Sequence, residues 1–337
     1  MTKRSNMTLT RRSILKTGLA GTALLGAPMI AYAKAATTLR AAHVESTESA
    51  THKGYLDFAQ KVAESTDGAV EVKVFPAGQL GNLRDLYEGI KLGSVDITSS
   101  GPDYTANIAP IMVTAALYYS YRDEAHADSL LDGAFSAKLS DALASQAGMR
   151  ILAWGELGWR SVFNTARPIE TAEDFKGLKL RVPEAQLHLL PMAALGAAPT
   201  PIPYSDVYTS MQTGVVDGAE GTPAAVVQQK FDEVSKFYSL TRHLYNPLHL
   251  VIADRSFGRM APEHQSAVQA AATEAFHAQR TQARADNTAA LTKMQDEGLP
   301  VNTPDVTEIR KIVIPTWQPL VENLGAQGQE LVDMLLA

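Results

Sequence analysis

Residues 174–183, DFKGLKLRVP, place two basic side chains where they can bind an anion. Strand-like alternation puts Lys179 and Arg181 on the face opposite Leu178, Leu180 and Val182, and Pro183 ends the strand. A guanidinium at a strand end can hold a carboxylate through two charge-assisted hydrogen bonds, each contributing about 1.5–3 kcal/mol. Taken alone, however, this segment favours an arginine that is solvated rather than one that binds a ligand.

Two further segments add a second arginine and an acid. Residues 155–161, GELGWRS, carry Trp159 and Arg160, and the two glycines predict a loop after a strand. Residues 214–223, GVVDGAEGTP, carry Glu220 between two helical patterns, and their alternative interpretation is an ordinary solvent loop. The chemistry that such groups support is recognition of a small charged molecule.

Signatures of catalysis and of metal binding are lacking in the sequence. It has no nucleophile elbow, zinc-binding helix, phosphate-binding loop or dinucleotide fingerprint. The eight histidines are scattered, and none pairs with another four residues away. We therefore expect a protein that is not an enzyme and that uses neither a metal nor a cofactor.

Short strand-like runs alternate with helical patterns along most of the chain. This alternation predicts βαβ units and a largely parallel sheet, the α/β class. Helices are predicted at residues 50–65, after Asn82 as far as Gly93, at 184–195 and at 204–212. Strands are predicted at residues 38–44, 70–75, 95–98, 150–154, 161–164, 178–182, 237–240 and 247–253.

Residues 262–297 form the most unusual stretch, because they contain no glycine and no internal proline. Apolar residues recur there at helical spacing, Pro262 suits a first turn, and Gly298 suits a stop. At ~1.5 Å per residue such a helix is about 54 Å long, which exceeds the width of one small domain. We expect it to pack across two lobes; the alternative is two helices broken near the polar residues 279–287.

The N-terminus has the composition of an export signal. Six basic residues and no acid occur in residues 1–34, a weakly apolar run follows, and the run ends in Ala31-Tyr32-Ala33. The pair Arg11-Arg12 predicts a twin-arginine signal over residues 1–33, and an ordinary secretory signal is the alternative. Cleavage there removes five of the 30 basic residues and changes the net charge from -6 to -11.

The overall composition excludes several classes of protein. With 45% hydrophobic and 20% charged residues, the 337-residue chain is not largely disordered. The acidic excess argues against nucleic-acid binding, which needs a basic surface. The lack of cysteine excludes disulfides and thiolate metal sites. The expected location is the periplasm.

The charged segments, taken together, resemble a known family. Residues 74–81 (VFPAGQLG), 158–160 (GWR), 173–183 (EDFKGLKLRVP), 204–208 (YSDVY) and 212–218 (QTGVVDG) are similar to motifs of the solute-binding proteins of tripartite ATP-independent periplasmic (TRAP) transporters, of the DctP type. The similarity runs in order over almost all of the chain that follows the signal.

This resemblance implies a fold and a division into lobes. The fold is a two-lobe periplasmic binding protein of type II-like architecture, with hinge strands and a long helix spanning both lobes, which closes around its ligand. The implied lobe I comprises residues 36–157 and about 247–280. The implied lobe II comprises residues 158–246 and about 281–337.

The resemblance also implies roles for individual residues. Arg181 pairs with the ligand carboxylate, Arg160 supplies a second contact, and Glu220 lines the cleft, whereas Gly221 replaces the usual Asn. Further candidates for ligand contact are Glu184 and Ser100, and then His43 and Glu45. Apart from the resemblance, the aromatic side chains of Trp159 and Tyr245 are candidates to stack on a ring of the ligand.

Two arginines and several polar groups predict a small carboxylate ligand. The favoured ligand is a sugar acid such as a uronate or an aldonate. A site built for hydroxyls rejects analogues that lack them, because its polar groups are then left unpaired. The implied partner is a TRAP membrane permease, and the implied state is a monomer, with a dimer as the alternative. Two other functions remain open: a sensor that presents its ligand to a membrane receptor, and an exported glycoside hydrolase with Glu184 and Glu220 as its acid pair.

Overall fold

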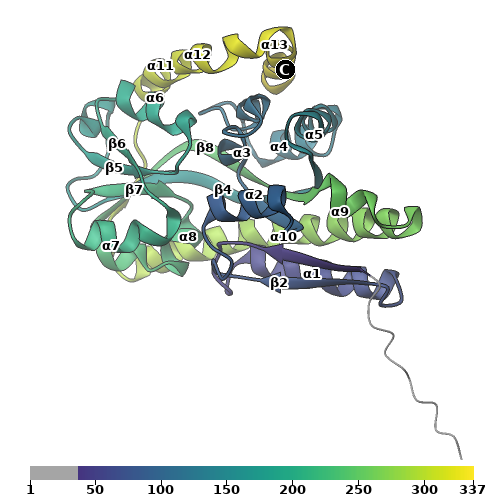
Figure 1. Ribbon diagram of the computed structural model, residues 1–337. Coiled ribbons are helices and arrows are strands. Elements are labelled where there is room, and N and C mark those ends of the chain that lie inside the picture. Colours follow the sequence, from purple (N-terminus) through teal and green to yellow (C-terminus); the bar gives the residue numbers. More distant parts are fainter. Residues whose placement is uncertain (1–36) are drawn as a thin grey trace, which may run out of the picture. The chain divides into compact units, whose positions relative to one another are not determined.

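The computed structural model of the chain describes residues 37–337. The predicted export signal lies outside these residues. The described part contains one nine-stranded sheet with helices packed on its two faces (Figure 1). The strands are β1 (Thr37–Ala42), β2 (Val70–Phe75), β3 (Ile97–Ser100), β4 (Met149–Asn164), β5 (Lys179–Val182), β6 (Ala198–Pro201), β7 (Gly218–Gly221), β8 (Phe237–Ala253) and β9 (Val301–Asn302).

The sheet is mixed, in the order β2-β1-β3-β8-β4-β7-β5-β6, with β9 beside β8. Strands β1, β2 and β3 are parallel to one another, and so are β5, β6 and β7. These two parallel groups are joined by the long antiparallel pair β4 and β8, which extends through both. The prediction of a largely parallel sheet is correct for the two groups and wrong for the centre.

Strands β4 and β8 each replace two shorter predicted strands. The loop predicted at residues 155–161 is wrong, since these residues continue β4 through two shifts of register against β8. Gly155 marks a close approach rather than a turn, because a Cβ there would lie 2.2 Å from Oε1 of Gln279. Glycines inside a strand that a helix crosses look the same in sequence as glycines that end the strand.

In the first third of the chain, the helices begin and end at the residues that local capping signals predict. Ser49 caps α1, and Asn82 and Asp85 form a capping box at the start of α2, which ends at Gly93 in a left-handed conformation. The helices are α1 (Ala50–Ser65), α2 (Leu83–Leu92), α3 (Pro102–Thr105), α4 (Glu124–Leu131), α5 (Ala134–Ala147), α6 (Gln186–Ala194), α7 (Val207–Gln212), α8 (Pro223–Gln228), α9 (Asp254–Gly258), α10 (Pro262–Asp296), α11 (Thr307–Val313), α12 (Gln318–Val321) and α13 (Gly325–Leu336).

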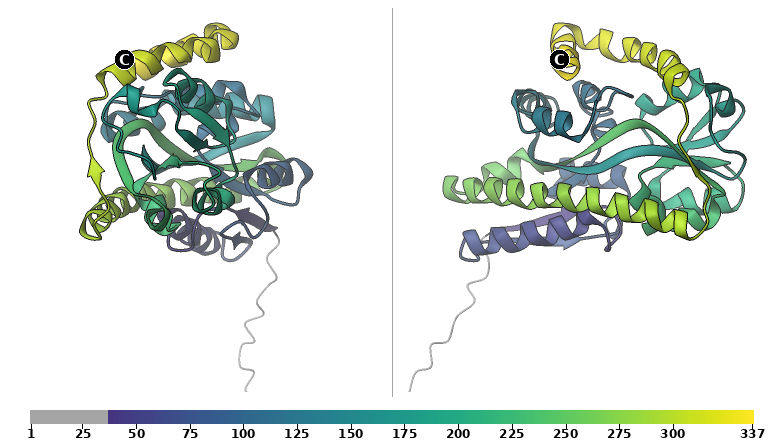
Figure 2. Two further views of the ribbon diagram at one scale, coloured as in Figure 1. Left: turned by 90° about the vertical axis from the view of Figure 1, so that its left-hand side faces the viewer. Right: turned by 180° about the vertical axis from the view of Figure 1, so that it is seen from behind.

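Helix α10 is one uninterrupted helix of 35 residues, so the alternative of two broken helices is wrong. It runs beneath the long strands and reaches both groups of parallel strands (Figure 2). Its polar stretch is explained by this crossing: Gln279 accepts a hydrogen bond from the Glu156 amide at 2.9 Å and donates to the Glu156 carbonyl at 2.7 Å. The polar residues bind β4 instead of interrupting the helix.

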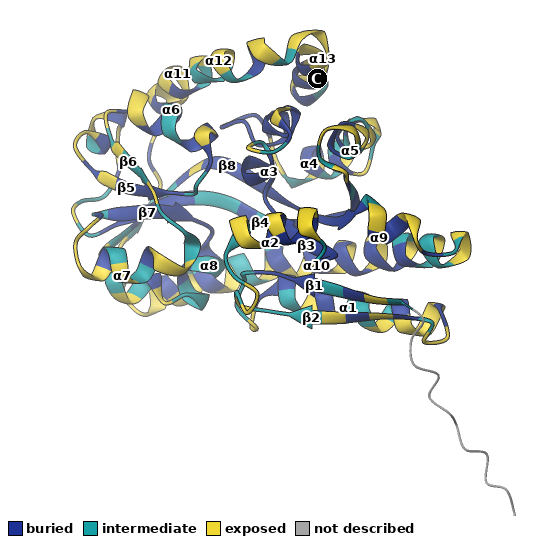
Figure 3. Cartoon of the chain, viewed as in Figure 1, coloured by how far each residue is buried: buried dark blue, intermediate teal, exposed yellow. Residues whose placement is uncertain are grey.

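The apolar core has three parts, which hold the two groups of strands against the helices. One lies among β1, β2, α1 and the first half of α10; a second lies among β7, α7, α8 and Met294 near the end of α10. The largest fills the opposite side of the sheet, under α2–α6 and α11–α13. The buried strands and the exposed outer faces of the helices are visible in Figure 3. No helix among residues 37–337 combines the length and apolar character that a membrane span needs.

Candidate functional site

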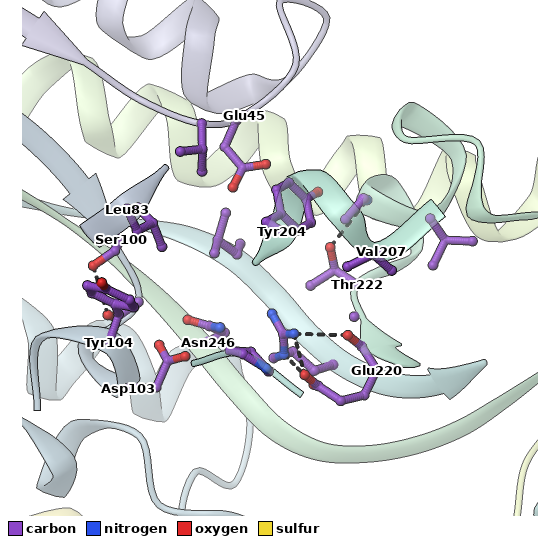
Figure 4. A pocket seen from close by; sticks show the side chains of 18 of the residues that line it. Glu45, Leu83, Ser100, Asp103, Tyr104, Tyr204, Val207, Glu220, Thr222 and Asn246 are labelled. Carbon is purple, nitrogen blue, oxygen red and sulfur yellow. Dashed lines mark hydrogen bonds and ion pairs between the residues drawn. The ribbon is translucent and has the colours of Figure 1, made fainter. Parts of the chain in front are cut away.

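A cavity lies where the two groups of parallel strands meet, at the carboxyl ends of their strands. Glu45 follows β1, Ser100 ends β3 and Glu220 lies near the end of β7 (Figure 4). Arg181 lies near the end of β5. The volume of this cavity is about 90 Å³, and a second cavity of about 600 Å³ shares Arg181 as part of its wall. Crevices at the carboxyl ends of parallel strands are the usual ligand sites of open α/β sheets.

Arg160 and Glu220 form a buried ion pair on one wall of this cavity. Nε of Arg160 donates to Oε2 of Glu220, and Nη2 donates to Oε1 at 2.5 Å and to the Glu220 carbonyl at 2.9 Å. Burial alone would raise the pKa of Glu220, but Arg160 and His243 hold it well below its ordinary value. Glu220 is therefore ionised, and it neutralises Arg160 instead of presenting free oxygens to a ligand.

Arg181 has no such counterion. Its side chain is buried, and Nε donates to the carbonyl of Ile202 at 2.8 Å. Within residues 37–337 no carboxylate lies in ion-pair distance of it, and its two Nη groups make no hydrogen bond. Burial lowers the pKa of Arg181 to about 10, so it stays charged at neutral pH. The site thus holds one buried guanidinium that has no carboxylate of the described chain within ion-pair distance.

Glu45 and Ser100 also line the cavity. Burial raises the pKa of Glu45 to about 7, although Arg160 and Tyr204 oppose this shift. Ser100 is already engaged, because its Oγ lies 2.6 Å from the Tyr87 hydroxyl and donates to the Gly101 carbonyl at 3.0 Å. Glu45 is consequently the freer of the two groups to interact with a ligand.

Glu184 lines the outer cavity rather than the inner one. Its carboxylate lies 3.4 Å from Nη2 of Arg84, and its carbonyl accepts a hydrogen bond from Asn107 at 2.8 Å. Arg84 and Asn107 belong to the segments around α2 and α3, whereas Glu184 follows β5. These contacts link the two sides of the site at its mouth.

The remaining three predicted residues do not line either cavity. Nε2 of His43 lies 3.0 Å from Nδ1 of His52. Trp159 donates from Nε1 to Glu124 at 2.6 Å, and Tyr245, packed edge-on against Trp159, donates to Glu156 at 2.7 Å. Their polar atoms are thus used within the fold.

The lining residues that were not predicted from the sequence include the polar Asp103, Tyr204 and Asn246. Asp103 follows the predicted strand at residues 95–98 by a few positions, directly after Gly101-Pro102, and this is the one local signal it offers. Asn246 lies in the middle of β8, in residues that looked like a loop between two strands. In residues 37–337 no group of three or more His, Asp or Glu side chains is arranged to hold a metal ion.

Comparisons with known proteins agree with this architecture. Residues 41–323 match the family model DctP, described as bacterial extracellular solute-binding protein, family 7. The 2,3-diketo-L-gulonate-binding periplasmic protein YiaO of Escherichia coli (strain K12) is 35% identical over 269 residues, which cover 80% of this chain and 82% of that protein.

Solved structures of similar proteins include ligand complexes. A TRAP periplasmic solute-binding protein from Roseobacter denitrificans with bound β-D-glucuronate matches with a TM-score of 0.86 at 28% identity, over 89% of this chain and 99% of that one. Another from Xanthobacter autotrophicus Py2 with bound β-D-galacturonate matches with a TM-score of 0.85 at 30% identity, over 88% and 99%.

Proposed function

The chain belongs to the DctP family, family 7 of the bacterial extracellular solute-binding proteins, and on this basis we propose that it captures a sugar acid in the periplasm for a TRAP transporter. The family binds solutes and is not enzymatic. The favoured ligands are uronates and aldonates, held in the cavity between the two groups of parallel strands.

The observation that carries this proposal is the state of Arg181. A buried guanidinium without a counterion is costly, and a ligand carboxylate removes that cost by pairing with it. Glu220 already pairs with Nε and Nη2 of Arg160, so among the hydrogen-bonding groups of Arg160 Nη1 is left for a ligand. The site therefore has a place for one carboxylate, on Arg181.

The remainder of the cavity favours a hydroxylated ligand over a second carboxylate. Glu45 and Asp103 both line it, so a dianion would bring its second charge close to acids. Hydroxyl groups can instead donate to these oxygens. Similar proteins whose solved structures hold glucuronate and galacturonate support this choice of ligand class.

Capture followed by delivery requires the site to open and close. We propose that β4 and β8 act as the hinge between lobe I (residues 36–157 and about 247–280) and lobe II (residues 158–246 and about 281–337). The closed protein then docks as a monomer on a TRAP permease.

The pairing of Glu220 with Arg160 argues against the hydrolase alternative, because a carboxylate with a strongly lowered pKa is a poor general acid.

A binding screen tests the proposal. Thermal unfolding is followed with D-glucuronate, D-galacturonate, L-galactonate and D-erythronate, with succinate and hexanoate for comparison, and Kd is then measured by calorimetry. We expect at least one sugar acid to bind, and Arg181→Ala to weaken it at least about tenfold. Lys179→Ala is the matched control, because Lys179 lies on the same strand but is exposed. Failure of every carboxylate to bind would refute the proposed function.

A further inference from the structure

Asp103 is a buried carboxylate in the wall of the inner cavity. It lies in α3, directly after β3, and only 5% of its surface is exposed. It is close to the side chain of Asn246 at the edge of the cavity (Figure 4). The resemblance described above assigns no role to this residue.

One oxygen of Asp103 is fixed by a chain of buried hydrogen bonds. Oδ2 lies 2.9 Å from Nε2 of His188, and Nδ1 of His188 lies 2.8 Å from the Tyr118 hydroxyl. Burial raises the pKa of Tyr118 well above its ordinary value, so its hydroxyl stays protonated where it pairs with Nδ1. Because an ionised carboxylate oxygen can only accept, Nε2 of His188 is the donor to Oδ2, and the carboxylate is held in a single orientation.

The other oxygen, Oδ1, has no hydrogen-bond donor among residues 37–337. Space for it depends on Gly101, since a Cβ at that position would lie 2.0 Å from Oδ1. Although burial opposes ionisation, the hydrogen bond from His188 keeps the pKa of Asp103 below its ordinary value. An ionised, buried acceptor that is left unpaired is costly, so the site favours a ligand that donates to Oδ1.

We propose that Asp103 is the residue that selects a hydroxylated monoacid, by accepting a hydrogen bond from one ligand hydroxyl at Oδ1. His188 and Tyr118 position it. The same charge disfavours a ligand with a second carboxylate at that place. This inference rests on the proposed function, because Arg181 must hold the ligand carboxylate for the hydroxyls to face Asp103.

The test compares the effect of removing each ligand hydroxyl in two proteins. Kd is measured by calorimetry for D-galacturonate and for its 2-, 3- and 4-deoxy derivatives, and for galactarate, with the wild type and with Asp103→Asn. Asp103→Asn keeps the volume of the side chain and an oxygen that can accept from His188. Asp103→Ala is measured as well, with thermal unfolding to verify folding, and Asp141→Asn on the exposed surface of α5 controls for the loss of one charge.

In the wild type, we expect the removal of one particular hydroxyl from the ligand to raise Kd at least about tenfold, since a charge-assisted bond of ~1.5 kcal/mol is lost. In both Asp103 variants, the same removal should raise Kd less than about threefold. We also expect Asp103→Asn to bind galactarate more tightly relative to D-galacturonate than the wild type does. Equal penalties for every hydroxyl in the wild type and the variants would overturn the assignment of Asp103 while leaving the proposed function intact. If the wild type binds none of these acids, the proposed function fails and this inference fails with it.

Discussion

Arg181 can be tested by a substitution that removes its charge and keeps its length. Arg181→Met replaces the guanidinium with a thioether of similar reach on the same strand. The two Nη groups that make no hydrogen bond within the described chain are lost, together with the bond from Nε to the Ile202 carbonyl. Binding and stability should respond in opposite directions.

The magnitudes follow from the surroundings of this residue. Two charge-assisted hydrogen bonds to a carboxylate contribute at least about 3 kcal/mol, so binding should weaken about 150-fold or more. Burial lowers the pKa of Arg181 to about 10, which corresponds to a penalty on the order of 3 kcal/mol for the charged form. Removing the charge relieves this penalty and loses one charge-assisted hydrogen bond of about 1.5–3 kcal/mol. The free energy of unfolding should therefore stay constant or rise by up to about 1.5 kcal/mol.

Arg160→Met is the informative counterpart, because it leaves the buried Glu220 without its guanidinium partner and with His243, 3.3 Å away, as its remaining ion-pair contact. We expect it to lower the free energy of unfolding by about 3–5 kcal/mol. Urea denaturation without ligand and calorimetry with D-galacturonate give both quantities for both variants. If Arg181→Met destabilises the protein as much as Arg160→Met does, or if it binds the sugar acid with wild-type affinity, Arg181 is not a buried guanidinium that awaits the ligand carboxylate.

Three further substitutions probe other parts of the site and its scaffold. Burial raises the pKa of Glu45 to about 7, so Glu45 is neutral below that pH and gains negative charge above it. Because this charge repels an anionic ligand, the Kd for D-galacturonate, measured by calorimetry, should rise about three- to tenfold between about pH 6 and about pH 8. An equally steep pH profile in Glu45→Gln would contradict this prediction. Gln279→Ala leaves two backbone groups of β4 without their partner and should cost about 2–4 kcal/mol in urea denaturation, whereas the exposed Gln282→Ala should change stability little. The ion pair of Glu184 with the exposed Arg84 contributes about 0.2–1 kcal/mol, so Glu184→Ala should change Kd less than about fivefold; a larger loss would indicate direct ligand contact.

Elements with local signals could be predicted from the sequence. Helices α1 and α2 have their caps in the adjacent residues, and α10 follows from 35 residues without glycine or internal proline. The long strands β4 and β8 could not be predicted as continuous. Each crosses the site, where arginine, asparagine and glycine interrupt the apolar pattern. Their pairing joins residues that are 73 to 104 positions apart, from Asn164 with Phe237 to Met149 with Ala253.

The site shows the same division. Arg181 and Arg160 lie in recognisable motifs, and the structure brings both to the cavity. Which of the two is free depends on Glu220, and that pairing is set by the register of β4 against β7. His43 and Trp159 follow strands or glycines as ligand-binding residues do, but tertiary contacts turn them to other partners. A lone acid after Gly-Pro gave too little local signal to single out Asp103.

The most direct test of ligand binding at Arg181 is a crystal structure of the protein with D-galacturonate. We predict that both carboxylate oxygens of the sugar lie about 3 Å from the Nη atoms of Arg181, while Glu220 remains paired with Arg160. A sugar carboxylate placed away from Arg181, or one that displaces Glu220 from Arg160, would contradict the assignment of Arg181 as the residue that holds the ligand carboxylate.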